Sequence, residues 1–400
     1  MSPVVCIAGK NQIAVNAIDY VIQSHPQLSV LALPNKGDDG VNGWQPSYRR
    51  HAAKRGVRIA ELGELQDIPN LLFISLEFAE IIRPSHFKSG ELFNVHFSLL
   101  PKYKGMYTSA WPLLMGERST GVTLHRIDRG IDTGDIVAQS SFAIQPSDTA
   151  ADLYARYLEA GFELFKASFG LLVKGGAKAV QQPYEGASYF SKRSIDYSKL
   201  CIDFSKTAFE VVNQFRAYTF REFQLPTFAG WDICAARPLS SKSSLKPGTT
   251  VYESDRTFAV STIDFDVELQ KDFYRPFWAA AVGNDAPELE RLAKFIPDLG
   301  LRSAKGWSAA ILAAYHGNAE ALQTLLRLGV NPNSTNYKGT TLLMYAFSHF
   351  EKTGRSDCFD CLLAWGADAA SVDDDGRSIA DYMVMRGNTE LLHLVEKRGG

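Results

Sequence analysis

The residues of this sequence best suited to chemistry are an asparagine and a histidine two positions apart. Asn94 and His96 lie in the run FNVHFSLLPKYKG, which begins as a strand and breaks into a loop at Pro101 and Gly105. Because strand side chains alternate between two faces, Asn94 and His96 point to the same side. A polar pair on a buried strand costs free energy unless it is used. This strand end is therefore a candidate site.

An aspartate in a second segment completes a candidate triad. Asp132 lies in HRIDRGIDTGDIV, in a loop that contains Gly130 and Gly134. A carboxylate beside His96 would fix its tautomer and favour its protonated form. A lone strand histidine is more often a core residue, so the interpretation depends on the whole combination. His125, on the strand before the aspartate loop, is interpreted as structural.

The elements around these residues alternate in type. Helical periodicity over 13–25 and 149–175 separates short apolar runs rich in β-branched and aromatic residues. Such alternation predicts an α/β, Rossmann-like domain built on a mostly parallel sheet. The turn at Gly9 lacks GxGxxG, which argues against the usual dinucleotide site. The expected strands are VVCIAG, SVLALP, NLLFISL, LFNVHF, TGVTLHRI and DIVAQSSFAI.

The pattern changes twice further along the chain. Residues 186–270 contain one helix and several short strands, which predicts a small β-rich subdomain after a catalytic domain at 1–185. In 271–400, Gly306, Gly339 and Gly376 open similar units at spacings of 33 and 37 residues, and Gly-Asn pairs recur at the inter-helix turn. These features resemble ankyrin repeats, an all-α architecture in which stacking of the units buries the apolar faces.

Composition limits the class of protein. The 400 residues exceed one usual core, and 46% hydrophobic with 22% charged residues is ordinary for a soluble protein. A net charge of −2 offers no basic domain for nucleic acid. We see no signal peptide or apolar membrane span. Five scattered cysteines favour a reducing cytoplasm, and Cys358 and Cys361 are interpreted as a buried apolar pair rather than a metal or redox site.

The two motifs together resemble a known family. Asn-x-His-x-Ser-Leu-Leu-Pro, followed by Asp-x-Gly-Asp-Ile, is similar to the 10-formyltetrahydrofolate-dependent formyltransferases over residues 1–230. The resemblance places Asn94, His96 and Asp132 at the catalytic positions. An amine would attack the formyl carbon, Asn94 would donate to the formyl oxygen, and His96 would donate or accept a proton. Asp132 would orient His96. The family also implies that main-chain groups in two loops hold the pterin: Leu76, Phe78, Ile81, Ile127, Arg129, Gly130 and Ile131.

The acceptor is predicted from the loop and the second subdomain. MYTSAW follows Lys104-Gly105, where the ribonucleotide and tRNA enzymes commonly carry an arginine. The run SYFSKRSIDYSK, with NQFRAYTF, resembles enzymes that formylate nucleotide-linked amino sugars. Basic side chains would bind a diphosphate and aromatic rings would stack on thymine, although packing is an alternative for each ring. The substrate-binding candidates are Lys102, Lys104, Met106, Tyr107, Tyr189, Lys192, Arg193, Arg216, Tyr218 and Phe220.

The architecture is similar to sugar N-formyltransferases that carry ankyrin repeats, so the expected acceptor is a dTDP-linked 3-amino-3,6-dideoxyhexose used for O-antigen or other surface glycans. A homodimer also fits. Alternatives are another amine, such as glycinamide ribonucleotide, or an inactive scaffold. The repeats would bind a protein partner, or a second nucleotide sugar near the repeat tips through Arg302, Lys305, Trp307, Tyr315, Tyr337, Lys338 and Tyr345.

Overall fold

The computed structural model describes residues 2–396 of the chain. Two compact units, Met1–Gln270 and Lys271–Gly400, make up the chain and are described separately. No helix in the described part of the chain is both long and apolar enough to pass through a membrane.

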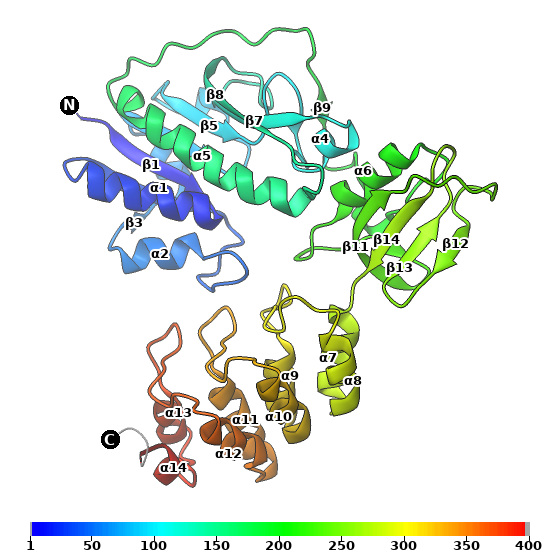
Figure 1. The fold of residues 1–400 in the computed structure, drawn as a ribbon. Coiled ribbons are helices and arrows are strands. Elements are labelled where there is room, and N and C mark those ends of the chain that lie inside the picture. The colour runs from blue at the N-terminus through cyan, green and yellow to red at the C-terminus, as the bar shows by residue number, and fades with distance from the viewer. Residues whose placement is uncertain (1, 397–400) are drawn as a thin grey trace. The chain divides into compact units, whose positions relative to one another are not determined.

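A seven-stranded sheet forms the centre of the first unit (Figure 1), in the order β3-β2-β1-β4-β5-β7-β8. The pairs from β3 to β5 are parallel, whereas β7 is antiparallel to both β5 and β8. The predicted α/β sheet is thus confirmed, with an antiparallel edge. The chain moves outward from β1 to β3 and returns to the other side of β1 as β4, so the strand order reverses between β1 and β4. The strands are β1 (Val4–Gly9), β2 (Ser29–Pro34), β3 (Arg58–Ile59), β4 (Leu71–Leu76), β5 (Leu92–His96), β7 (Ser119–Arg126) and β8 (Ile136–Ala143).

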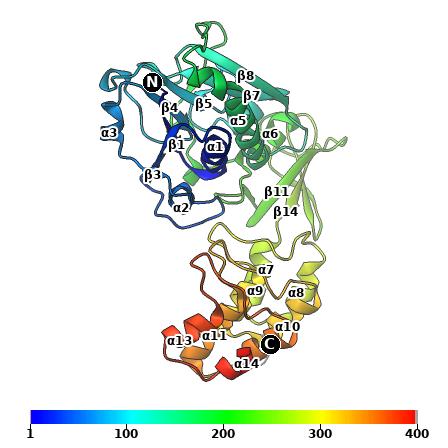
Figure 2. The same cartoon turned by 90° about the vertical axis from the view of Figure 1, so that its left-hand side faces the viewer.

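Helices cover one face of this sheet. The helices α1 (Asn11–Ser24) and α5 (Ala150–Val173) lie side by side in both views (Figures 1 and 2), and α2 (Tyr48–Lys54) packs against α1. Gly161 of α5 brings the helix against Val95 of β5, since a Cβ there would lie 3.4 Å from the Val95 side chain. The other face is covered by α3 (Leu62–Gln66) and by the loop before β5.

A glycine at the end of β1 allows close approach to β4. A Cβ at Gly9 would lie 2.0 Å from the carbonyl oxygen of Leu76, so the strands would have to separate. We expect Gly9→Ala to lower the free energy of unfolding by about 1 to 3 kcal/mol, measured by urea or thermal denaturation. Gly63→Ala is the matched control, because nothing lies within 4 Å of its added Cβ in helix α3. Equal stability of the two variants would contradict this account.

A smaller layer completes the first unit. Helix α6 packs its apolar face, including Val211 and Phe215, against a five-stranded sheet in the order β10-β11-β14-β13-β12. A two-stranded parallel pair, β6 with β9, brings Lys104 beside Tyr189. The remaining elements are α4 (Trp111–Leu114), α6 (Ala208–Tyr218), β6 (Lys104–Gly105), β9 (Tyr189–Phe190), β10 (Thr227–Phe228), β11 (Trp231–Pro238), β12 (Thr250–Glu253), β13 (Thr257–Val260), β14 (Val267–Lys271) and the 3₁₀ turns Pro84–His86 and Tyr197–Lys199.

The second unit is a stack of short helix pairs. The Gly317-Asn318 pair explains the repeated Gly-Asn motif: Gly317 ends its helix in the left-handed region, with φ of 72°, and the Asn318 amide donates to the carbonyls of Ala281 and Val282 in the preceding unit. The helices are α7 (Tyr274–Val282), α8 (Ala286–Ala293), α9 (Ala309–His316), α10 (Ala319–Arg327), α11 (Leu342–Thr353), α12 (Asp357–Ala364), α13 (Ile379–Met385) and α14 (Leu392–Glu396).

The CxxC pair lies on α12. Cys358 is buried and Cys361 half-buried, and burial raises the pKa of Cys358 to about 12. A thiol with so high a pKa is not a reactive thiolate at neutral pH. Among residues 2–396, no group of three or more His, Cys, Asp or Glu side chains could hold a metal ion.

Candidate active site

The three triad residues come together at the edge between β5 and β7. His96 Nδ1 lies 3.5 Å from Asp132 Oδ2, and Asn94 Nδ2 lies 3.4 Å from Asp132 Oδ1. His96 is 8% exposed, so its ring is shielded from bulk water. One carboxylate therefore faces both the amide and the imidazole, within ion-pair distance of the ring.

The hydrogen bonds of His96 determine which ring nitrogen can work as a base. Nε2 lies 2.9 Å from the carbonyl oxygen of Tyr103, which only accepts, so Nε2 carries a proton. Nδ1 is then the nitrogen that gains or loses a proton, and it faces Asp132. Tyr103 itself has a positive φ of 59°.

Burial and neighbouring charges have opposite effects on the pKa values of His96 and Asp132. Burial lowers the pKa of His96 below its usual value of 6.5, although the Asp132 charge works against this effect. Burial would raise the pKa of Asp132, but the neighbouring His96, the contact with His125 and the Gly105 amide together lower it to about 2. Near neutral pH the site thus holds a neutral imidazole beside an ionised carboxylate.

His125 belongs to this site, although the sequence was interpreted as giving it a structural role. The strand register pairs His125 with Asn94 across β5 and β7. Nδ1 of His125 donates to the Arg126 carbonyl at 2.7 Å, so its Nε2 accepts from the Asn94 amide at 3.1 Å. This bond and the 3.4 Å contact to Asp132 together hold the Asn94 amide group in one orientation.

The loop that carries Asp132 is held from several sides. Asp132 has a positive φ of 54°, and its Oδ2 accepts from the Gly105 N–H at 2.9 Å. Gln182 donates to the carbonyls of Asp132 and Gly134 at 2.9 and 2.7 Å. Neither Gln182 nor Tyr103 was predicted from the sequence, because their contributions to the site depend on tertiary contacts.

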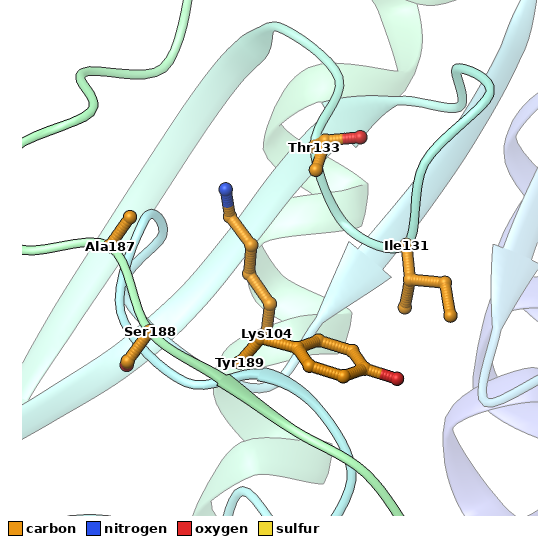
Figure 3. Close-up of a pocket in the computed structure, with 6 residues that line it drawn as sticks. All are labelled: Lys104, Ile131, Thr133, Ala187, Ser188 and Tyr189. Atoms are coloured by element: carbon orange, nitrogen blue, oxygen red, sulfur yellow. The ribbon is translucent and has the colours of Figure 1, made fainter.

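A pocket of about 440 Å³ opens beside the triad (Figure 3). Ile131 and Thr133 flank Asp132 on one wall, and Lys104 and Tyr189 form the opposite side. The Lys104 ammonium group points into the space between these walls (Figure 3). A cavity with apolar walls and few polar groups is the usual form of a small-molecule site.

The predicted pterin-binding residues lie on the two loops that border the triad. Leu76 is fully buried and its carbonyl accepts from Lys10, so its side chain is core. Ile81 and Ile131 are 71% and 43% exposed, which is unusual for isoleucine and gives apolar surface to a flat ring. The loop also contains Phe78, which packs on Phe73. Ile127, Arg129 and Gly130 complete the predicted set on the second loop.

Some of the residues predicted to bind the acceptor substrate are exposed, whereas others are already engaged in contacts within the protein. Lys102 is paired with Glu117 at 2.8 Å, and Arg216 donates to the carbonyls of Asp148 and Gln145 and to Asn213. Arg216 is therefore engaged inside the protein, which argues against the predicted role in diphosphate binding. The buried Phe220 packs on Trp44, and Tyr218 on Tyr197. Tyr107 donates to the Lys192 carbonyl. The exposed candidates are Met106, Tyr189, Lys192 and Arg193.

Family models match both units of the chain. Residues 50–168 match the formyl transferase family, and residues 277–373 match ankyrin repeats in three copies. The first match includes Asn94, His96 and Asp132.

Solved structures give the more extensive match. The chain is 40% identical to WlaRD, a sugar 3N-formyltransferase crystallised in the presence of dTDP and 5-N-formyl-THF, with a TM-score of 0.63 over 68% of this chain and 98% of that one. The chain belongs to the sugar N-formyltransferases. A second family member, the Helicobacter canadensis N-formyltransferase in complex with folinic acid and dTDP-3-aminofucose, gives the same identity and TM-score over 68% of this formyltransferase and 100% of its own chain.

Curated relatives of this formyltransferase include methionyl-tRNA formyltransferases. The Coxiella burnetii enzyme is 36% identical over 170 residues, which are 42% of this chain. The chain spans about half the length of that relative, 54%. This match therefore concerns part of each chain rather than the whole of either protein.

Proposed function

We propose that this protein transfers a formyl group from 10-formyltetrahydrofolate to the amine of a dTDP-linked amino-dideoxy sugar. The observation that carries the proposal is the assembled triad of Asn94, His96 and Asp132 in a chain that is 40% identical to a sugar 3N-formyltransferase over nearly all of that enzyme. The acceptor that we favour is a dTDP-3-amino-3,6-dideoxyhexose. Its product would serve surface glycan synthesis, and the enzyme would work in the cytoplasm as a homodimer.

The triad residues have distinct tasks in this proposal. The amide of Asn94 donates to the formyl oxygen as that oxygen gains negative charge, through the N–H that makes the long contact to Asp132. Nδ1 of His96 takes the proton of the attacking amine, because Nε2 is already committed to Tyr103. The ionised Asp132 stabilises the resulting imidazolium without itself becoming protonated, since its pKa is about 2. The imidazolium then returns this proton to N10 of the folate as the bond between the formyl carbon and N10 breaks, which releases tetrahydrofolate and the N-formyl sugar.

The residues beside the triad suit a folate donor. Bound 10-formyltetrahydrofolate supplies the electrophilic formyl carbon, and its pterin is a flat ring with hydrogen-bonding edges. Exposed Ile81 and Ile131 offer apolar contact, and the main chain of their loops offers amide and carbonyl groups. Both related sugar enzymes were crystallised with a formyl-folate compound, which supports the same donor here.

The pocket of Figure 3 supports a nucleotide-linked acceptor. Lys104 supplies a positive charge at its centre, and the 54% exposed ring of Tyr189 supplies a stacking surface. Lys192 and Arg193, both exposed, follow on the same segment. A base and a diphosphate need such a combination of aromatic and basic groups.

The mass of the product tests the proposal. Incubation of the protein with 10-formyltetrahydrofolate and dTDP-3-amino-3,6-dideoxyglucose should give a nucleotide sugar heavier by one formyl group in place of one hydrogen. Glycinamide ribonucleotide and methionyl-tRNA are the comparison acceptors. Formylation of either of these with none of the sugar would refute the choice of acceptor, and the absence of any product would favour an inactive scaffold.

For the repeats, we propose a protein partner, with a second nucleotide sugar as the alternative. The alternative is favoured by one cluster: the ring of Trp307 lies 5.4 Å from the rings of both Tyr315 and Tyr345, measured between centroids. Arg302 lies 4.4 Å from the ring of Tyr337. Equilibrium dialysis with dTDP, on the intact protein and on Trp307→Ala, distinguishes a protein partner from a second nucleotide site. If both proteins bind the same amount of dTDP, dTDP binds only at the first unit and the second site is ruled out.

A further inference from the structure

One carboxylate at the edge of the sheet has no part in the mechanism above. Glu77 directly follows β4, and its Oε2 accepts from the Tyr154 hydroxyl at 2.8 Å and from Asn11 Nδ2 at 3.2 Å. The Asn11 amide also donates to the Tyr154 hydroxyl at 2.7 Å. Burial raises the pKa of Glu77, although Lys10 and these two hydrogen bonds act against the rise. The other oxygen, Oε1, has no hydrogen bond to any residue in 2–396.

The backbone around this carboxylate is held in an uncommon conformation. Asn11 has φ of 61° and Glu77 has φ of 60°, in the left-handed region that glutamate rarely adopts. Asn35 secures the turn on both sides, because its amide donates to the Glu77 carbonyl at 3.1 Å and its Oδ1 accepts from the Ala79 N–H at 3.0 Å. Such conformations cost free energy and are concentrated at ligand sites.

The position of Glu77 in the fold is the one where open α/β sheets bind ligands. Asn11 follows β1 and Glu77 follows β4, and the strand order reverses between these two strands. In such sheets the ligand lies outside the carboxyl ends of the strands at this reversal. Asn94 and His96 of the triad lie on β5, the strand next to β4. Glu77 and the triad therefore border the same region at the carboxyl ends of the strands.

The strand register gives the separation of Glu77 from the triad. Leu76 pairs with Val95, which places Glu77 level with His96 on the neighbouring strand. Neighbouring strands lie about 4.8 Å apart, a gap that one pyranose ring bridges. Val95 packs toward α5, so His96 points to the opposite face, whereas Glu77 turns toward Tyr154 of α5. A sugar that contacts both must therefore lie across the carboxyl ends of the two strands.

The acceptor atoms around Glu77 favour a ligand that donates hydrogen bonds. Two oxygens, Glu77 Oε1 and Asn11 Oδ1, accept no hydrogen bond from residues 2–396, so the site offers acceptors to a ligand that donates hydrogen bonds. Trp44, 5.9 Å from the ring of Tyr154, adds an aromatic wall. We infer that Glu77, oriented by Asn11 and Tyr154, binds the C4 hydroxyl group of the acceptor sugar, one of the two hydroxyl groups next to the amine at C3. This inference rests on the proposed function and identifies a specificity residue for it.

Two acceptors and one substitution test the inference. The probes are dTDP-3-amino-3,6-dideoxyglucose and its 3,4,6-trideoxy counterpart, which lacks the C4 hydroxyl group. For the unchanged enzyme we expect kcat/KM to favour the hydroxylated sugar by about 10- to 100-fold, the range for a hydrogen bond to a charged group. Glu77→Gln should bring this ratio close to one and leave the KM for the formyl donor unchanged. Tyr154→Phe, which keeps the ring, should lower the ratio partly.

The controls separate recognition from folding. Glu80→Gln changes a nearby carboxylate of the same loop, which pairs with the exposed Lys36, and should keep the full ratio. Loss of activity by the same factor on both sugars in Glu77→Gln would indicate a purely structural role and overturn the inference. An unchanged ratio would overturn it as well. If the unchanged enzyme formylates neither sugar but another amine, the proposed function itself is refuted, which is a distinguishable result.

Discussion

Asp132→Asn should lower kcat/KM by about 10²- to 10⁴-fold with little change in the melting temperature. The substitution keeps the size of the side chain but removes the charge that faces His96 Nδ1 at 3.5 Å. Without that charge, the imidazolium formed when His96 takes the amine proton loses its main stabilisation. Steady-state kinetics with 10-formyltetrahydrofolate and the dTDP-amino sugar measure the loss, which should fall mainly on kcat.

Asp135→Asn is the matched control for this experiment. Asp135 lies three residues further along the same loop and is exposed, and its main-chain carbonyl rather than its carboxylate holds Arg126. Its loss should leave kcat/KM within a factor of two or so, as is typical of surface substitutions. If Asp132→Asn and Asp135→Asn were equally active, Asp132 would not be part of the catalytic group.

His96→Asn should lower kcat/KM by a comparable factor, about 10²- to 10⁴-fold, and should also change the pH profile. In the proposed mechanism the neutral ring is the base, so the rate of the unchanged enzyme should rise with pH through the pKa of His96 and then level off. Since burial lowers that pKa, the rise should lie below pH 6.5. Asp132 cannot cause it, because its pKa of about 2 keeps it ionised throughout that range.

The rise on the acid side should disappear in His96→Asn, leaving only the ionisation of the acceptor amine, which is common to both enzymes. His51→Asn is the control, because His51 lies on α2 and pairs with Asp19 at 2.9 Å, away from the triad. A variant at position 96 that kept the same acid limb as the unchanged enzyme would show that another group takes the proton.

The sequence alone was sufficient for the local and periodic features of this protein. Apolar runs predicted six of the seven strands of the main sheet, all except the short β3, and the spacing of Gly306, Gly339 and Gly376 predicted the helix pairs of the second unit. These signals survive in a sequence because side-chain direction follows the chain with a fixed period. The paired motifs around His96 and Asp132 identified the family, and the comparisons confirmed that identification.

The contacts between residues that are far apart in the chain were decided only by the tertiary structure. Pairing of β5 with β7 brings His125 to Asn94, and the β6–β9 pair brings Tyr189 to Lys104. Residues far apart in the chain meet there through strand register, which no single segment encodes. The same contacts engaged Arg216 inside the fold and gave Glu77 its partners on α1 and α5. The sequence specifies the type of each side chain. Which of its hydrogen-bonding atoms remain available to a ligand depends on the neighbouring elements that pack around it.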